Sequence, residues 1–101
     1  KGAYLPAVIL RGANLKRVKL TKANLTGANL TGADLTEADL TGTNLKEANL
    51  AEAYLYRANL TGANLTEAFL IGADLEGVNL NGVYQFSGTI WPKGFTPPNN
   101  I

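Results

Sequence analysis

A leucine stands at every fifth position from Leu5 to Leu80, sixteen times in unbroken succession. The residue two places before each leucine is small, being Ala in twelve repeats and Val or Thr in the others. The residue directly before each leucine is Asn or Asp in eleven repeats, and Gly is frequent two places after it. The chain is therefore an internal repeat of the form Ala-Asn/Asp-Leu-Thr-Gly, and its fold must treat these leucines equivalently.

A period of five fits neither an α-helix nor a flat strand. In a helix of 3.6 residues per turn, a step of five residues advances about 140° beyond a full turn and spreads the leucines over every face. In a strand, an odd period alternates successive leucines between opposite faces. The pattern instead favours a short extended piece, with the small residue and the leucine pointing inward, and then a two-residue corner where Gly eases the turn. The chain must coil around its own leucine column, and the periodicity alone leaves open whether each coil has three or four sides.

The repeats Ala-Asn-Leu-Thr-Gly, Ala-Asp-Leu-Thr-Glu and Ala-Asn-Leu-Lys-Glu resemble the A(D/N)LXX consensus of the pentapeptide repeat family over residues 3–82. This resemblance implies an all-β fold, a right-handed quadrilateral parallel β-helix of about four coils in which residue n stacks on residue n+20. The stretch from Gly88 to Pro97 resembles the Thr-x-Trp-Pro-x-Gly-Phe-x-Pro tail of many cyanobacterial members. It implies a protein of the cyanobacterial type, with cytoplasm, periplasm and thylakoid lumen all open as compartments.

The repeat pattern fails after Leu80, where Gln85 stands at the position expected for the next leucine. Four apolar residues follow: Phe86, Ile90, Trp91 and Phe95. A solenoid needs a cover over its last coil, so we expect a solenoid over residues 1–84 and a C-terminal cap over residues 85–101. At the other end the chain begins within the repeat and without Met, which indicates a fragment or a processed chain whose first coil is uncovered. An exposed strand edge invites pairing, so end-to-end self-association is a second interpretation.

Composition argues against catalysis and against several kinds of partner. The chain has no His, Cys or Met and a formal net charge of +1, so disulfides, soft-metal sites and the commonest catalytic acid and base are excluded. A leucine-filled solenoid with outward carboxylates offers no catalytic pocket. No apolar run approaches the roughly 18 residues of a membrane span. We therefore expect no enzyme, no cofactor, no metal, no nucleic-acid binding and no membrane insertion.

Several outward positions depart from the consensus, and they are the candidate binding residues. Tyr54 and Tyr56 lie on one side of the third coil, and with Arg57 they form a candidate recognition patch, because Tyr and Arg are favoured at binding hot spots. Phe69 and Ile71 lie on the neighbouring side one coil later. With the spacing of twenty, Ile71 stacks on Trp91, so we expect these two residues to pack against the tail.

Other outward columns predict structure rather than function. Three columns are notable: Thr21, Thr41 and Thr61; Asn24, Asn44 and Asn64; and Arg17, Glu37 and Arg57. The first two predict ladders of like side chains bonded along the axis, and the third predicts an exposed ladder of ion pairs. Thr43 is the one hydroxyl in the inward small column, and we expect it to bond a backbone carbonyl.

Two functional hypotheses remain. The first is a non-catalytic scaffold or protein-interaction module with a partner that the sequence does not identify. The alternative is the branch of the family that mimics duplex DNA and binds DNA gyrase, which the charge distribution disfavours. Duplex DNA carries one charge per about 1.7 Å, so four coils at about 4.8 Å each would need about eleven unopposed acids. The chain has eight, all between residues 34 and 76, and a basic first coil.

Overall fold

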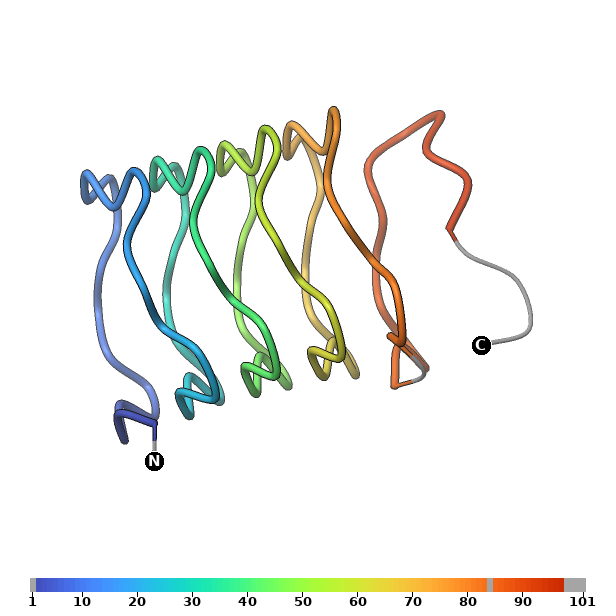
Figure 1. The fold of residues 1–101 in the computed structure, drawn as a ribbon. Helices are drawn as coiled ribbons and strands as arrows, with labels where there is room; N and C mark the ends of the chain where they lie inside the picture. Colours follow the sequence, from blue (N-terminus) through green and yellow to red (C-terminus); the bar gives the residue numbers. More distant parts are fainter. Residues whose placement is uncertain (1, 84, 98–101) are drawn as a thin grey trace.

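The structure is a computed structural model that describes residues 2–83 and 85–97, and it shows a column of stacked coils (Figure 1). Consecutive coils pair through isolated parallel β-bridges between residues twenty apart, such as Asn24 with Asn44. The described residues contain no helix, and no strand extends beyond a single bridge residue. Accordingly, none of them belongs to a helix long and apolar enough to cross a membrane. Each bridge residue is the centre of a short extended segment between two turns, as the period of five predicts.

The bridges define four sides, which confirms the expected four-sided coil. Each side is named here by its outward bridge residues. Side 1 holds Tyr4, Asn24, Asn44, Asn64 and Gln85; side 2 holds Ile9, Asn29, Asn49, Phe69 and Ile90; side 3 holds Asn14, Asp34, Tyr54 and Asp74; side 4 holds Lys19, Asp39, Asn59 and Asn79. Backbone hydrogen bonds join the coils along every side, as where the Leu25 N–H donates to the Asn44 carbonyl at 2.8 Å.

The core consists of the two inward columns predicted from the sequence. The leucines from Leu25 to Leu70 are at most 1% exposed, and the small residues between them are equally buried. Thr43 is fully buried in the small column, and its hydroxyl donates to the Leu20 carbonyl at 2.9 Å, as expected. Among the described residues, no buried side-chain nitrogen or oxygen lacks a hydrogen-bond partner. Burial of this continuous apolar column is the main favourable term for the fold.

Each corner is a four-residue turn with its third residue in the left-handed region. The carbonyl of Leu25, for example, accepts from the Ala28 N–H at 2.9 Å, and Gly27 between them has φ 70°. A positive φ at this place is the mark of a type II turn, which explains the frequent Gly there. Non-glycine residues also hold this conformation, including Glu47 at φ 61° and Arg57 at φ 57°.

The Asn and Asp side chains bond locally, and the predicted axial ladders are wrong. Asn24 Oδ1 accepts from the Thr26 N–H at 3.1 Å and from the Thr26 hydroxyl at 2.6 Å. An Asn or Asp side chain readily bonds the backbone N–H two residues later in its own turn. This local hydrogen bond forms in place of a bond to the like side chain of the next coil. The same geometry lowers the pKa of Asp34, first through the Thr36 hydroxyl, then through the Thr36 N–H and, more weakly, through the charge of Lys16.

The ladder continues past Leu80, but with one extra residue. Asn64 pairs with Gln85 and Phe69 pairs with Ile90, which are twenty-one residues apart. Gln85 therefore takes the outward place of an Asn, and Phe86 follows Leu65 in the inward column. The prediction that Gln85 replaces the leucine is wrong, because Gln85 pairs with the outward residue Asn64.

The same shift places Trp91 in the inward column, where it is partly buried. Trp91 now follows Leu70 in the inward column, so the predicted stacking of Ile71 on Trp91 is also wrong. Phe86, Trp91 and Phe95 pack against the buried core. The rings of Phe86 and Trp91 meet edge to face at 6.2 Å between centroids, and Trp91 stacks on Phe95 at 5.2 Å. Three of the four expected capping residues thus cover the last coil, whereas Ile90 points outward and is 45% exposed.

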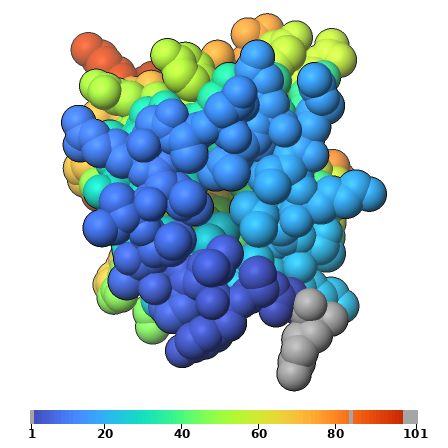
Figure 2. All heavy atoms as spheres, turned by 90° about the vertical axis from the view of Figure 1, so that its left-hand side faces the viewer, coloured from blue at the N-terminus to red at the C-terminus, as the bar shows by residue number. Residues whose placement is uncertain are grey.

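The two ends of the column differ. At the N-terminal end, shown face-on in Figure 2, the leucines Leu5, Leu10, Leu15 and Leu20 are only partly buried. At the C-terminal end, the aromatic tail lies over part of the last complete coil. The tail supplies a further rung on sides 1 and 2 only, because its bridges end at Ile90.

Candidate functional site

The structure places Tyr54, Tyr56 and Arg57 on the third coil, as predicted. Tyr54 is the outward residue of side 3 and is 53% exposed. Tyr56 and Arg57 occupy the corner between sides 3 and 4, where Tyr56 is partly buried and Arg57 is exposed. The Arg57 guanidinium lies 5.4 Å from the centroid of the Tyr56 ring, within the range of a cation–π contact. The two residues therefore present one combined surface.

The predicted column of ion pairs, Arg17–Glu37–Arg57, forms only in its first half. Arg17 Nη1 lies 3.3 Å from Glu37 Oε1, so the first pair of the column forms. Within the described residues, Glu37 and Arg57 form no ion pair, because the Arg57 guanidinium lies against Tyr56 instead. The remaining ion pair, Lys16 Nζ to Asp34 Oδ2 at 3.9 Å, also belongs to the basic N-terminal end.

Phe69 and Ile71 are exposed, at 39% and 48%, and the tail does not cover their side chains. The tail instead adds its backbone to the edge of side 2, where Ile90 N–H donates to the Ala68 carbonyl at 2.9 Å. Ile90 consequently lies beside Phe69 as the next outward residue of the same side. Ile71 occupies the corner between sides 2 and 3. Trp91, by contrast, belongs to the capping cluster inside the column.

Together these positions form a band of exposed apolar and aromatic groups around the C-terminal half of sides 2 and 3. We call it the aromatic band; it consists of Ile90, Phe69, Ile71, Tyr54, Tyr56 and Arg57. Sequence reasoning missed Ile90 because it assumed an unbroken spacing of twenty. The signal was present, since Phe86 and Trp91 stand five residues apart, as the leucines do, but one place later than the leucine register.

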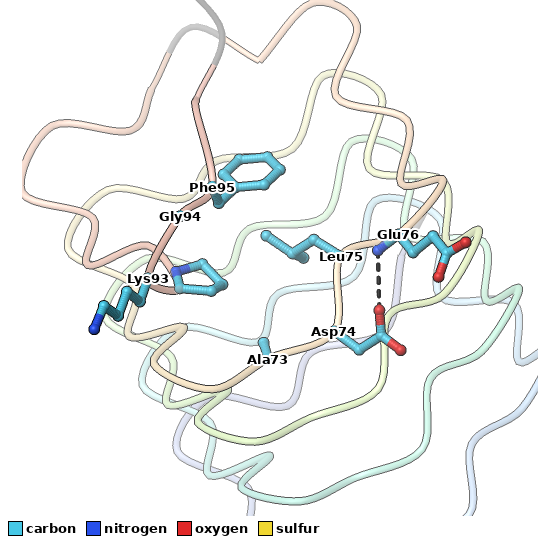
Figure 3. A pocket seen from close by; sticks show the side chains of 8 residues that line it. Ala73, Asp74, Leu75, Glu76, Lys93, Gly94 and Phe95 are labelled. Carbon is cyan, nitrogen blue, oxygen red and sulfur yellow. Dashed lines mark hydrogen bonds between the residues drawn. The ribbon is translucent and has the colours of Figure 1, made fainter.

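A hollow adjoins this band at the C-terminal end of side 3 (Figure 3). It measures about 410 Å³, is open to solvent, and is lined by Ala73–Glu76 on the last complete coil and by Pro92–Phe95 on the tail. Figure 3 shows Leu75, from the last complete coil, and Phe95, from the tail, among the side chains that line the hollow. Beside them the Glu76 N–H donates to Asp74 Oδ1 at 3.0 Å. The sequence analysis expected no pocket, and the hollow at the end of the column corrects that expectation.

The carboxylates of the described residues are not gathered into one cluster. No group of three or more Asp or Glu side chains among them is arranged to hold a metal ion. The two carboxylates with lowered pKa, Asp34 and Asp39, are held by Thr36 and Thr41 and lie on sides 3 and 4 of the second coil, far along the column from the hollow.

Stacked coils, an inward leucine column and left-handed corners every five residues define a repeat β-solenoid. The pentapeptide repeat family model matches the chain with 8 copies, over residues 9–46 and 43–82. The chain therefore belongs to the pentapeptide repeat family, whose members form right-handed quadrilateral β-helices. Among curated proteins, none matches the sequence.

Three solved structures are informative. HetL, a pentapeptide repeat protein involved in heterocyst differentiation regulation from the cyanobacterium Nostoc, is 38% identical with a TM-score of 0.86 over 91% of this chain. Rfr23 from the cyanobacterium Cyanothece is 40% identical with a TM-score of 0.85 over 88% of this chain. The chain spans only 42% of HetL and 60% of Rfr23. QnrB1, a plasmid-mediated fluoroquinolone resistance protein, is 18% identical with a TM-score of 0.51 over 85% of this chain and 63% of its own, which shows the fold alone.

Proposed function

We propose that this protein is a non-catalytic interaction module that binds a partner protein through the aromatic band. The observation that carries the proposal is the exposure of Tyr54, Phe69 and Ile71 at outward positions where most repeats have Asn, Asp or Thr. Exposed apolar groups gathered on one part of a surface mark interaction sites more often than isolated ones do. Tyr and Arg are also the residue types that dominate binding energy at protein interfaces.

The structure gives a physical reason why stability does not favour these residues. Every Asn or Asp directly before a column leucine accepts a hydrogen bond from the backbone N–H two residues on. Tyr54 and Phe69 have no side-chain acceptor for this bond, and the N–H groups of Tyr56 and Ile71 have no partner among the described residues. Each replacement gives up a bond worth about 0.5–1.5 kcal/mol. A fold selected for stability alone would retain Asn at both positions.

The relatives agree with a role in recognition. HetL is involved in the regulation of heterocyst differentiation, and a regulatory role of that kind is compatible with a protein that acts by contact. The charges do not favour the alternative of gyrase binding by DNA mimicry. Asp34 and Glu37 are paired with Lys16 and Arg17, so part of the acidic surface is neutralised along the column. An unopposed negative surface of the density of DNA is therefore missing from the described residues.

An affinity comparison tests the proposal, with the wild-type chain, a Tyr54→Ser and Ile71→Ser double variant, and a matched control as baits in extracts of a cyanobacterium. The control, Tyr4→Ser with Ile9→Ser, makes the same chemical changes at residues of the first coil that are 77% and 76% exposed. We expect a partner that is enriched by the wild type and the control but reduced about tenfold with the band variant, as measured by quantitative mass spectrometry.

All three chains must show the same circular dichroism and the same midpoint of thermal unfolding, because the substituted side chains lie outside the core. Proteins lost equally from both variants, or from neither, would contradict a role for the band. A DNA gyrase supercoiling assay with the same three chains tests the alternative. Inhibition or protection of gyrase by the wild-type chain would favour DNA mimicry instead.

A further inference from the structure

The last complete coil ends in a backbone edge on side 3 that has no neighbour among the described residues. One coil earlier, the corresponding edge is fully paired. There the Leu55 N–H donates to the Asp74 carbonyl at 2.8 Å, and the Asp74 N–H donates to the Ala53 carbonyl at 2.9 Å. The equivalent groups of the last coil, the Leu75 N–H and the Ala73 carbonyl, have no such bonds within the described residues. The edge therefore presents a donor and an acceptor at ladder spacing.

The described part of the tail leaves this edge uncovered because it turns one residue later than the corner before it. In that earlier corner the Ala73 N–H donates to the Leu70 carbonyl at 3.0 Å. The chain then turns away from side 3 through Gly94, which has φ 83°, and the Phe95 N–H closes the turn on the Pro92 carbonyl at 3.1 Å. The space that a fifth rung of side 3 would fill is the hollow of about 410 Å³ (Figure 3).

Burial is less complete on the inner side of this rung than one coil earlier. Ala53 and Leu55 are at most 1% exposed, whereas Ala73 and Leu75, their equivalents one coil later, are both 8% exposed. Phe95 also lines the hollow, which is apolar within and open at its rim. A strand inserted between Leu75 and Phe95 would bury apolar side chains on its inner face and gain backbone hydrogen bonds with the edge.

We infer that this edge and hollow bind an extended segment of a partner protein, which adds as a parallel strand to side 3. Strand addition to an exposed edge takes its affinity from main-chain bonds and its specificity from pockets for alternate side chains. The ladder dictates the register. One residue of the segment donates to the Ala73 carbonyl and accepts from the Leu75 N–H, and the residue two places later accepts from the Gly77 N–H. The residues flanking the first of these point inward, a small one over Ala73 and a large apolar one over Leu75.

The charged residues at the rim of the hollow determine which outward side chains the bound segment can carry. Asp74 and Glu76 are exposed beside the edge, so a segment with neutral or basic outward residues is favoured over an acidic one. The chain itself shows such a pairing between neighbouring coils in the ion pair of Lys16 with Asp34. The motif expected in the partner is thus small–neutral–large–basic in an extended conformation. This inference goes beyond the aromatic band, because it uses backbone groups and the hollow, and either site can fail without the other.

Nuclear magnetic resonance of the ¹⁵N-labelled full chain tests the inference. The probe is the peptide Ala-Asn-Leu-Lys-Gly-Ala-Asn-Leu-Thr-Gly with blocked ends, and the control peptide carries an N-methyl group on its first Asn. We expect the probe to shift the amide signals of Leu75, Gly77 and Phe95 and to slow hydrogen exchange at Leu75 and Gly77. The N-methylated peptide loses a ladder bond and should bind about tenfold more weakly.

A charge reversal gives a second readout that does not disturb the core. Glu76→Lys should weaken binding of the probe about threefold, whereas Glu47→Lys, the same change at an exposed corner away from the hollow, should leave it unchanged. The inference is overturned if the N-methylated peptide binds as well as the probe, or if no amide along Ala73–Gly77 responds at millimolar peptide. Slow exchange of the Leu75 and Gly77 amides in the free chain would also overturn it, because the chain's own residues would then occupy the edge.

Discussion

The buried hydroxyl of Thr43 allows the contributions of one hydrogen bond and one methyl group to be separated. Thr43 is fully buried between neighbouring coils, and its hydroxyl donates to the Leu20 carbonyl at 2.9 Å. That carbonyl also accepts from the Ala23 N–H at 3.0 Å, so removal of the hydroxyl leaves no unsatisfied acceptor. Substitution by Val keeps the shape and removes only the bond, which should lower the free energy of unfolding by about 1 kcal/mol.

The other two members of the series complete a cycle. Thr43→Ser keeps the hydroxyl and removes a buried methyl group, which should lower the free energy of unfolding by about 1 kcal/mol. Thr43→Ala removes both groups and restores the consensus residue, yet we expect it to be the least stable, by about 2 kcal/mol. If the two groups act independently, the losses of the Ser and Val variants sum to the loss of the Ala variant within about 0.5 kcal/mol.

Urea unfolding at 25 °C measures the series, followed by far-ultraviolet circular dichroism and by the fluorescence of Trp91, the single tryptophan. Coincident transitions by the two probes show that the column unfolds as one unit. A useful comparison is Thr89→Val, because Thr89 donates in the same way to the Leu65 carbonyl at 2.6 Å but is only partly buried. A Thr43→Val variant as stable as the wild type would refute the reasoning, since the hydroxyl would then contribute nothing to the fold.

Two further predictions concern the corners and the carboxylates. Gly32→Ala should lower the free energy of unfolding by about 1–2 kcal/mol through its positive φ alone, because no atom beyond its chain neighbours lies within 4 Å of the added Cβ. Gly77→Ala should lose more in the same urea assay, since its Cβ would lie 3.0 Å from Arg57 Cγ; equal losses would contradict this contact. The Thr41 hydroxyl and N–H lower the pKa of Asp39 below its ordinary value of 3.8. The resulting stabilisation is present above that value and is lost as the pH falls through the folded-state pKa. Asp39→Asn should therefore lose less stability than the wild type between pH 7 and pH 3, and an equal loss of the urea midpoint would count against it.

The sequence predicted the column but not the path of its end, and the difference has a physical cause. Every leucine from Leu25 to Leu70 must be buried, so its position follows from the period alone. The change of spacing from twenty to twenty-one residues keeps the inward column apolar, because Phe86 and Trp91 are as apolar as the leucines that they follow. A prediction based on leucine positions therefore kept the spacing of twenty residues through the tail. The spacing of five between Phe86 and Trp91 would have revealed the shift.

The local hydrogen bonds of the outward Asn and Asp side chains were not predicted, for a different reason. Stacking like residues at the spacing of twenty made the predicted Asn ladder attractive. However, the backbone N–H two residues later offers each Asn side chain a nearer hydrogen-bond donor than the next coil does. Asn24 accordingly accepts from Thr26 within its own turn. This competition is visible in the sequence as Asn or Asp followed two places later by Thr. The hollow had no such signal, because it depends on where the tail turns after Pro92.

The local bond also separates the residues that serve the fold from those that do not. An outward Asn or Asp stabilises its own turn, so its presence carries no functional information. Tyr54 and Phe69 give up that bond, and both border the corner where Ile71 is exposed and where the tail diverges from side 3. The Ala73–Gly77 edge, which has no ladder partner among the described residues, begins at the same corner. Side chains without a structural reason and a backbone edge without a neighbour among the described residues thus lie in the C-terminal half of the column, where we propose that a partner binds.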